Sequence, residues 1–350
     1  MKEIRTPMNA LRRLAGIAFG AALALTSCSA LLAQGPYHVQ DKWKLGGDGG
    51  WDYLAVDPQS GLLYITRGNH VMVVDTTSGK AVADITGLKG THGVAFDTDG
   101  KTGYISDGAG NDVAVFDRAS NKITQTIPAG TNPDGILFEP STKTVWAFNG
   151  RSKNATVIDA KTKQVIATVA LAGKPEFPVA DGKGSVFVNI EDKNEITHLD
   201  AKSDTVLAEW PISCESPSGH AIDIANSRLF AVCDGKKMAV VDANTGKVVA
   251  SPEIGEGPDA AAFDPNTHNA FSSNGDGTLT VVHQDSPDSY SVAQTLATQK
   301  SARTMALDPK TGKIYLVAAE FGPRPAATPE NPRPRPPVLP GSFVVIVVSK

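Results

Sequence analysis

The feature of this 350-residue sequence that most limits how it can fold is a repeat of 40 to 44 residues. Short apolar segments end in an acidic residue and a turn, as in LAVDPQSG at 54–61, AAFDPNTH at 261–268 and MALDPKTG at 305–312. A second motif, exemplified by VMVVD at 71–75 and MAVVD at 238–242, recurs with the same period. Repeats of this length indicate an array of small supersecondary units. The acidic residues of the first motif are Asp57, Asp97, Glu139, Asp181, Asp223, Asp264 and Asp308.

Each repeat has the pattern of four short β-strands. Its apolar runs alternate with period two, are rich in β-branched and aromatic residues, and are separated by turn residues. A lone four-stranded sheet cannot bury both of its faces, so such units pack face to face around an axis. We therefore expect an all-β fold, a seven-bladed β-propeller.

The repeat pattern predicts that segments near the two ends of the chain complete one repeat between them. The seventh repeat ends in a third strand at 342–348, and no fourth strand follows it. The segment 37–45 (YHVQDKWKL) has the pattern of a fourth strand with no repeat before it. Pairing these segments removes an open sheet edge. We expect 36–350 to form one propeller domain in which the N-terminal strand closes the last blade.

The repeat motifs resemble those of a known family. The VxVxDxxTGxV pattern, the aromatic second strand (LLYITR, TGYISD, TVWAFN) and the 40–44-residue period resemble the YVTN-type β-propeller repeat proteins, a WD40/YVTN-like group. The resemblance covers about 36–350 and implies the fold. Exported members of that family look mostly like binding proteins, while related seven-bladed propellers include lactonases and quinoprotein subunits. The resemblance therefore does not select one function.

The first 33 residues have the composition of a secretory signal peptide. A basic segment at 2–13 precedes an apolar run at 14–25 and small residues up to Ala33. The run is too short to span a membrane. We expect cleavage near Ala33 and a periplasmic or secreted protein. LTSC at 25–28 also resembles a lipoprotein signal, and in that alternative a lipid on Cys28 would anchor the protein to a membrane.

The charge balance argues against nucleic acid as a partner. Without 1–33 the chain keeps 29 basic and 36 acidic side chains. A general nucleic-acid-binding protein needs a basic surface that displaces counterions from phosphates. The partners we expect are a small molecule or a protein, and we expect a monomer.

The start of each innermost strand predicts a polar site. In a propeller the innermost strand runs first, so residues five positions before the repeat acids lie at one end of the central channel, here called the channel mouth. Residues near the end of each second strand form a next shell on the same face, here called the top face. We predict that the ligand-binding residues are Asp52, His92, Asp134, Glu176, Asp259 and Arg303, joined by Arg67, Asp107, Asn149 and Asn274.

Several chemical roles fit these residues. Crowded carboxylates have raised pKa values unless a cation offsets their repulsion. A divalent cation bound by carboxylate and amide oxygens is the one cofactor that the pattern suggests. We find no pyrroloquinoline quinone (PQQ), NAD or haem motif: DANTGK at 242–247 resembles half of a quinoprotein docking motif and lacks its Trp.

Four functional interpretations stay open. The leading one is a binding protein that engages a ligand or protein partner at the top face. One alternative is a metal-assisted hydrolase of the lactonase kind, with a cation at Asp52, Asp134, Glu176 and Asp259 and with His92 as proton acceptor. The others are a structural component of an envelope complex and a channel whose polar side chains are merely hydrated.

Two cysteines remain after removal of the signal segment. Cys214 and Cys233 are 19 residues apart, and the topology places both on the top face in neighbouring blades. We predict that they form a disulfide, which an oxidising compartment permits. Two free thiols are the alternative.

A proline-rich insertion interrupts the last repeat at 322–341. It contains GPRPAATPENPRPRPP and replaces the short connection between the second and third strands, so it should rise from the top face. Such sequence favours extended polyproline conformation and forms no core. It could act as a lid or a docking arm, or it could be a solvated loop.

Overall fold

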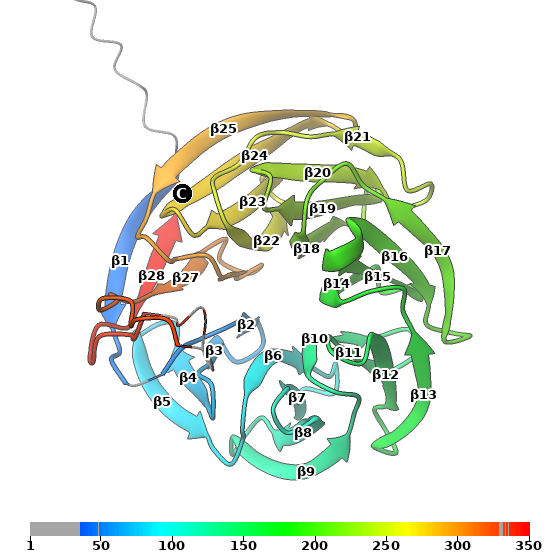
Figure 1. Ribbon diagram of the computed structural model, residues 1–350, viewed down its shortest axis with the longest axis horizontal. Helices are drawn as coiled ribbons and strands as arrows, with labels where there is room; N and C mark the ends of the chain where they lie inside the picture. The colour runs from blue at the N-terminus through cyan, green and yellow to red at the C-terminus, as the bar shows by residue number, and fades with distance from the viewer. Residues whose placement is uncertain (1–35, 48, 329–331, 333, 335) are drawn as a thin grey trace, which may run out of the picture. The chain divides into compact units, whose positions relative to one another are not determined.

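The computed structural model describes residues 36–47, 49–328, 332, 334 and 336–350. The predicted signal segment lies outside these residues. The unit Gln34–Lys350 consists of seven four-stranded antiparallel sheets that follow one another around a ring, with the innermost strands facing its centre (Figure 1). The prediction of an all-β, seven-bladed propeller is therefore confirmed. Within the described ranges, no helix is long and apolar enough to span a membrane.

Blades 1 to 4 each take their four strands from one continuous stretch of chain, running from the channel outwards. A single 3-10 turn, Glu191–Lys193, lies in blade 4. The strands are β2 (Leu54–Asp57), β3 (Leu62–Thr66), β4 (Val71–Asp75) and β5 (Lys80–Ile85); β6 (Thr91–Phe96), β7 (Thr102–Asp107), β8 (Asp112–Asp117) and β9 (Lys122–Pro128); β10 (Pro133–Glu139), β11 (Thr144–Asn149), β12 (Asn154–Asp159) and β13 (Gln164–Ala170); and β14 (Pro175–Ala180), β15 (Ser185–Ile190), β16 (Glu195–Asp200) and β17 (Thr205–Pro211).

Blades 5 and 6 follow the same plan, whereas blade 7 combines both ends of the chain. The remaining strands are β18 (Pro217–Asp223), β19 (Arg228–Cys233), β20 (Lys237–Asp242) and β21 (Val248–Ala250); β22 (Pro258–Asp264), β23 (Asn269–Asn274), β24 (Thr278–Ser286) and β25 (Ser289–Ala297); and β26 (Met305–Leu307), β27 (Ile314–Ala318), β28 (Val344–Ser349) and β1 (His38–Lys44).

The N-terminal strand closes the ring as the repeat pattern predicts. β1 pairs antiparallel with β28, from His38 opposite Ser349 to Lys44 opposite Val344. Just beyond the ladder, the carbonyl of Phe343 accepts hydrogen bonds from the backbone of Leu45 and Gly46, each at 3.1 Å. β28 is thus paired on both sides, with β27 and β1, which removes an edge that would otherwise be open.

The repeat acids organise turns on the face opposite the channel mouth. Asp57 accepts hydrogen bonds from the Gln59 backbone (3.0 Å) and the Ser60 hydroxyl (2.6 Å). Arg118 of blade 2 lies 2.5 Å from the same buried carboxylate and thereby joins two blades. Burial alone would raise the pKa of Asp57, but the hydrogen bonds from Arg118, Ser60 and Gln59 lower it.

Two tryptophans fill the space above glycines of the following blade. A Cβ built on Gly246 would lie 2.2 Å from the ring of Trp210, and one on Gly79 would lie 2.7 Å from the ring of Trp43. Both glycines have positive φ, +73° and +67°. Trp210 of the preceding blade thus packs against the turn of DANTGK at 242–247, and the contact serves packing between blades.

The predicted disulfide is confirmed. Cys214 and Cys233 are bonded, with their Cα atoms 5.8 Å apart. Cys233 ends β19, whereas Cys214 lies in the connection that follows β17 rather than within that strand. Both side chains are buried. The bond therefore ties the chain that enters blade 5 to the second strand of that blade.

Candidate binding site at the channel mouth

Three of the predicted site residues form one cluster across blades 1 to 3. The Nδ1 atom of His92 lies 2.6 Å from Asp52 Oδ2 and 3.6 Å from Asp134 Oδ1. One ligand atom from each of the three side chains lies within 4.8 Å of the others. Each comes from the residue just before, or just inside, the innermost strand of its blade. Their equivalent positions in the repeat explain why side chains far apart in sequence meet here.

The other predicted acids of the mouth each have a basic partner. Lys174 Nζ lies 2.5 Å from Glu176 Oε1 and also contacts the carboxylate of Glu191. Arg303 Nη1 lies 3.1 Å from Asp259 Oδ2. Lys174 was not among the predicted site residues because it lies two residues before the repeat position. Its place in the connection that enters β14 was the signal that could have found it.

Burial and crowding shift the titration of this ring. Burial raises the pKa of Asp259 to about 7, although Arg303 opposes the shift. Burial and the charge of Asp134 raise the pKa of Glu176 to about 8, with Lys174 offsetting part of the effect. Burial would lower the pKa of His92, but the hydrogen bond that its ring donates to Asp52 and the charge of Asp134 raise it to about 9. These groups therefore resist ionisation of all the acids together.

Two aromatic rings from different blades meet next to the acids of the mouth. Tyr53 of blade 1 and Phe177 of blade 4 pack edge to face with their centroids 4.8 Å apart. The Tyr53 hydroxyl lies 3.5 Å from Glu176 Oε2, and burial, then the surrounding carboxylates, raises its pKa. In three other blades the equivalent position is glycine, and at two of these, Gly135 and Gly219, a Cβ would lie 2.5 Å from the backbone of the next inner strand. This contrast in the repeat alignment was a signal that the sequence reasoning did not use.

The second shell of predicted residues is buried within its own loops. Asp107 accepts hydrogen bonds from the backbones of Lys89 and Gly90. The amides of Asn149 and Asn274 each donate to two nearby polar side chains within their own blades. Arg67 donates to the carbonyls of 46, 49 and 50 and stacks on Phe343 at 3.7 Å. These four side chains are therefore placed to shape loops, and they remain only a prediction as ligand contacts.

A groove of about 670 Å³ opens beside the mouth. Its walls are the loop that enters blade 1, the start of blade 7 and the base of the proline-rich insertion. Trp51 contacts the rings of Phe321 (5.9 Å between centroids) and Phe343 (5.5 Å). The lining residues are Gly49, Gly50, Trp51, Ser301, Arg303, Phe321, Pro336, Pro337 and Val338. Arg303 thus belongs both to the groove and to the ring of charged residues.

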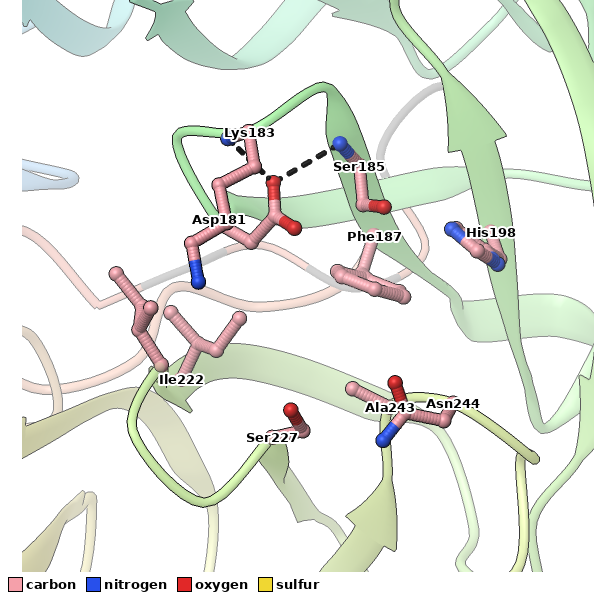
Figure 2. A pocket seen from close by; sticks show the side chains of 10 residues that line it. Asp181, Lys183, Ser185, Phe187, His198, Ile222, Ser227, Ala243 and Asn244 are labelled. Atoms are coloured by element: carbon pink, nitrogen blue, oxygen red, sulfur yellow. Dashed lines mark hydrogen bonds between the residues drawn. The ribbon is translucent and has the colours of Figure 1, made fainter.

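A smaller cavity of about 200 Å³ lies between blades 4 and 5, at the turns of the opposite face. Figure 2 shows Asp181 and Lys183 on one side of it, and Ser227 and Asn244 on the other. His198 stacks on Phe187 with the ring centroids 4.6 Å apart. Asp181 Oδ1 accepts hydrogen bonds from the backbone N–H groups of Lys183 and Ser185, and these bonds stabilise the turn.

Comparisons with known proteins agree on the fold. Hydrazine synthase of Kuenenia stuttgartiensis superposes with a TM-score of 0.67 over 80% of this chain and 95% of that chain, at 15% sequence identity. At that identity the likeness concerns the fold alone. No curated protein sequence matches the chain. The family model described as "Outer membrane protein assembly factor BamB" matches residues 134–318, more than half of the sequence. The chain therefore belongs to the BamB family of outer membrane protein assembly factors.

Proposed function

We propose that this protein is an exported binding protein that holds a segment of a partner polypeptide at its top face. The site consists of the groove between Trp51 and the proline-rich insertion together with the adjoining channel mouth. The scaffold role that the family description names, assembly of outer membrane proteins, is compatible with this proposal. Membership of the YVTN-type group remains a prediction.

The groove is the observation that carries the proposal. Its volume, about 670 Å³, is that of ordinary ligand sites, and its walls are aromatic and proline side chains with a few polar groups. Beside it, Phe321 is 43% exposed and Leu339 39% exposed. Exposed apolar side chains next to a concave surface are typical of interaction sites.

Two features support export. The N-terminal segment has the composition of a signal peptide. The Cys214–Cys233 disulfide fits an oxidising compartment. A periplasmic location would place the groove where envelope proteins are assembled.

A position-specific photo-crosslink tests the proposal. A benzophenone amino acid is introduced at Phe321 in the full chain, and the matched control carries it at Ile224, which is 47% exposed on the opposite face. We expect one defined protein adduct from position 321 in the native cell, lost when Trp51→Ala is added, and none from position 224. Equal adducts from both positions, or none from 321, would rule out a top-face partner site.

A second candidate function rests on the cluster of Asp52, His92 and Asp134. Two carboxylates and one imidazole are donors that suit Zn²⁺ or Mn²⁺. A cation there would supply Lewis-acid chemistry for hydrolysis. In that arrangement His92 would be a ligand rather than the proton acceptor. Glu176 and Asp259 would stay with Lys174 and Arg303.

Metal titration separates the two candidates. Under the hydrolase alternative, Zn²⁺ or Mn²⁺ raises the melting temperature of the protein as purified, and Asp52→Asn with His92→Gln abolishes that shift. The binding proposal requires no such shift. A saturable shift with a stoichiometry of one ion per chain would favour the hydrolase.

A further inference from the structure

The chemistry of the groove indicates what kind of segment it takes. We propose that it binds an acidic, aromatic segment of the partner polypeptide, whose ring lies against Trp51 and Phe321 while its carboxylate pairs with Arg303. This inference rests on the proposed function and makes its partner specific. Neither the family description nor the repeat motifs assign such a specificity.

The apolar part of the groove suits a flat side chain. Trp51 is half-buried between Phe321 and Phe343, so its ring is held in place. Pro336 and Pro337 line the facing wall. Proline offers no backbone donor, and its ring presents an apolar surface. An aromatic side chain gains most in such a slot because it buries a large area while losing few rotamers.

The polar part of the groove suits a carboxylate. Among the lining residues that the structure describes, Arg303 is the one with a charged side chain. Its side chain is 46% exposed, and its contact with Asp259 uses Nη1. A guanidinium has five N–H donors in a planar fork that matches a carboxylate. Arg303 can therefore keep Asp259 and still accept a second anionic partner.

The acids of the mouth lie deeper than the arginine. The side chain of Asp259 is 12% exposed and that of Asp134 is 13% exposed, against 46% for Arg303. A segment that enters from the groove therefore meets the guanidinium before the carboxylates. The guanidinium at the edge of the groove thus complements an acidic partner.

The walls of the groove are built before any partner arrives. Arg67 fixes the glycine loop by donating to the carbonyls of 46 and 50, at 3.2 and 3.1 Å. The base of the insertion forms a short ladder, with Gly322 donating to Pro337 (2.9 Å) and Leu339 to Glu320 (2.8 Å). A preformed site loses little conformational entropy when a ligand binds, which favours binding of a short segment.

Selection of random dodecapeptides displayed on phage against the immobilised mature protein tests the inference. We expect enrichment of peptides in which an aromatic residue lies next to Asp or Glu. Synthetic peptides of the enriched sequence should bind the wild type, and Arg303→Gln combined with Asp259→Asn should weaken binding about tenfold or more. The double variant removes the cation without leaving a buried acid unpaired. Trp51→Ala should weaken binding similarly, whereas the control Lys183→Gln on the opposite face should not.

The outcomes separate this inference from the proposed function. Enrichment of Lys- or Arg-containing peptides would overturn the acidic specificity and would keep a top-face partner site if the crosslink at 321 forms. Enriched acidic peptides that bind the double variant as well as the wild type would also overturn the role of Arg303. Failure of both the selection and the crosslink would reject the proposed function itself. Thermal melts of each variant establish that it is folded.

Discussion

Tyr53 and Phe177 meet edge to face across the central channel, with their ring centroids 4.8 Å apart, although they belong to blades 1 and 4. The same tyrosine also reaches the ring of charged side chains, because its hydroxyl lies 3.5 Å from Glu176 Oε2. A ligand or partner at the mouth has access from the groove side, where Arg303 is exposed.

The first prediction concerns the aromatic contact between Tyr53 and Phe177. Tyr53 is buried, so Tyr53→Ala should destabilise the protein by about 3 kcal/mol through lost packing and the cavity left behind. Tyr53→Phe removes only a 3.5 Å contact with Glu176 and should cost less than about 1 kcal/mol. Urea denaturation of the two variants measures the difference. Equal losses would mean that the hydroxyl, rather than the ring, is what matters.

The second prediction concerns pH. Glu176 has a folded-state pKa of about 8, above its ordinary value of 4.5. Its neutral form is therefore favoured by folding, and stability falls as the pH rises through that interval. His92 acts in the same direction, because its pKa of about 9 exceeds 6.5 and its contribution is lost as the pH rises through 9. The melting temperature should therefore decline between pH 5 and pH 9.

Glu176→Gln isolates the contribution of this carboxyl. The variant should match the wild type near pH 5 and melt about 3 °C or more above it near pH 9. Glu209→Gln, on the exposed outer strand β17, serves as the control and should track the wild type at both pH values. A variant less stable than the wild type near pH 9 would show that the pair with Lys174 outweighs the cost of burial.

The third prediction concerns the contact between Gly246 and Trp210. Gly246 and Gly312 have nearly the same φ, +73° and +72°, but only Gly246 has a ring where a Cβ would lie. Gly312→Ala should cost about 1 kcal/mol for the backbone conformation alone. Gly246→Ala should cost about 1–3 kcal/mol more, because Trp210 must move. Chemical denaturation of both variants measures the loss in free energy of unfolding. Equal losses would mean that Trp210 moves aside without destabilising the protein.

The fourth prediction concerns the disulfide. The bond closes a loop of 19 residues, and loop-closure entropy of that size contributes about 3 kcal/mol. Reduction should lower the melting temperature without abolishing the fold, because the seven blades do not depend on the bond for their pairing. Replacing both cysteines by alanine should make the protein insensitive to reductant. Unchanged melting on reduction of the wild type would contradict the estimate.

The fold could be predicted from the sequence because each blade repeats the same pattern of strand and turn residues. Acids such as Asp57 recur with a fixed period, and the unpaired segments at the two ends of the chain implied that β1 would pair with β28. The inner ring follows from the same register, because Asp52, His92 and Asp134 occupy equivalent positions in three repeats and their ligand atoms lie within 4.8 Å of one another.

The rest could not be predicted, for two physical reasons. Residues such as Arg67 and Asn149 have the chemistry of a site, but their hydrogen-bonding groups serve nearby backbone or side chains, which no spacing reveals. The groove depends on the side-by-side placement of the loop at 49–51, residues 301–303 and the base of the insertion. These segments do not belong to the repeat, so the repeat alignment does not predict where they lie relative to one another.

The most direct test of the central claim is the affinity of the partner crosslinked at Phe321 for the mature protein with and without residues 323–340, measured by calorimetry. The deletion removes Pro336, Pro337 and Val338 from the groove and leaves all 28 strands in place. We predict a cooperative melt close to that of the intact protein and an affinity at least about tenfold weaker. A folded deletion variant that binds the partner as tightly as the intact protein would contradict the account.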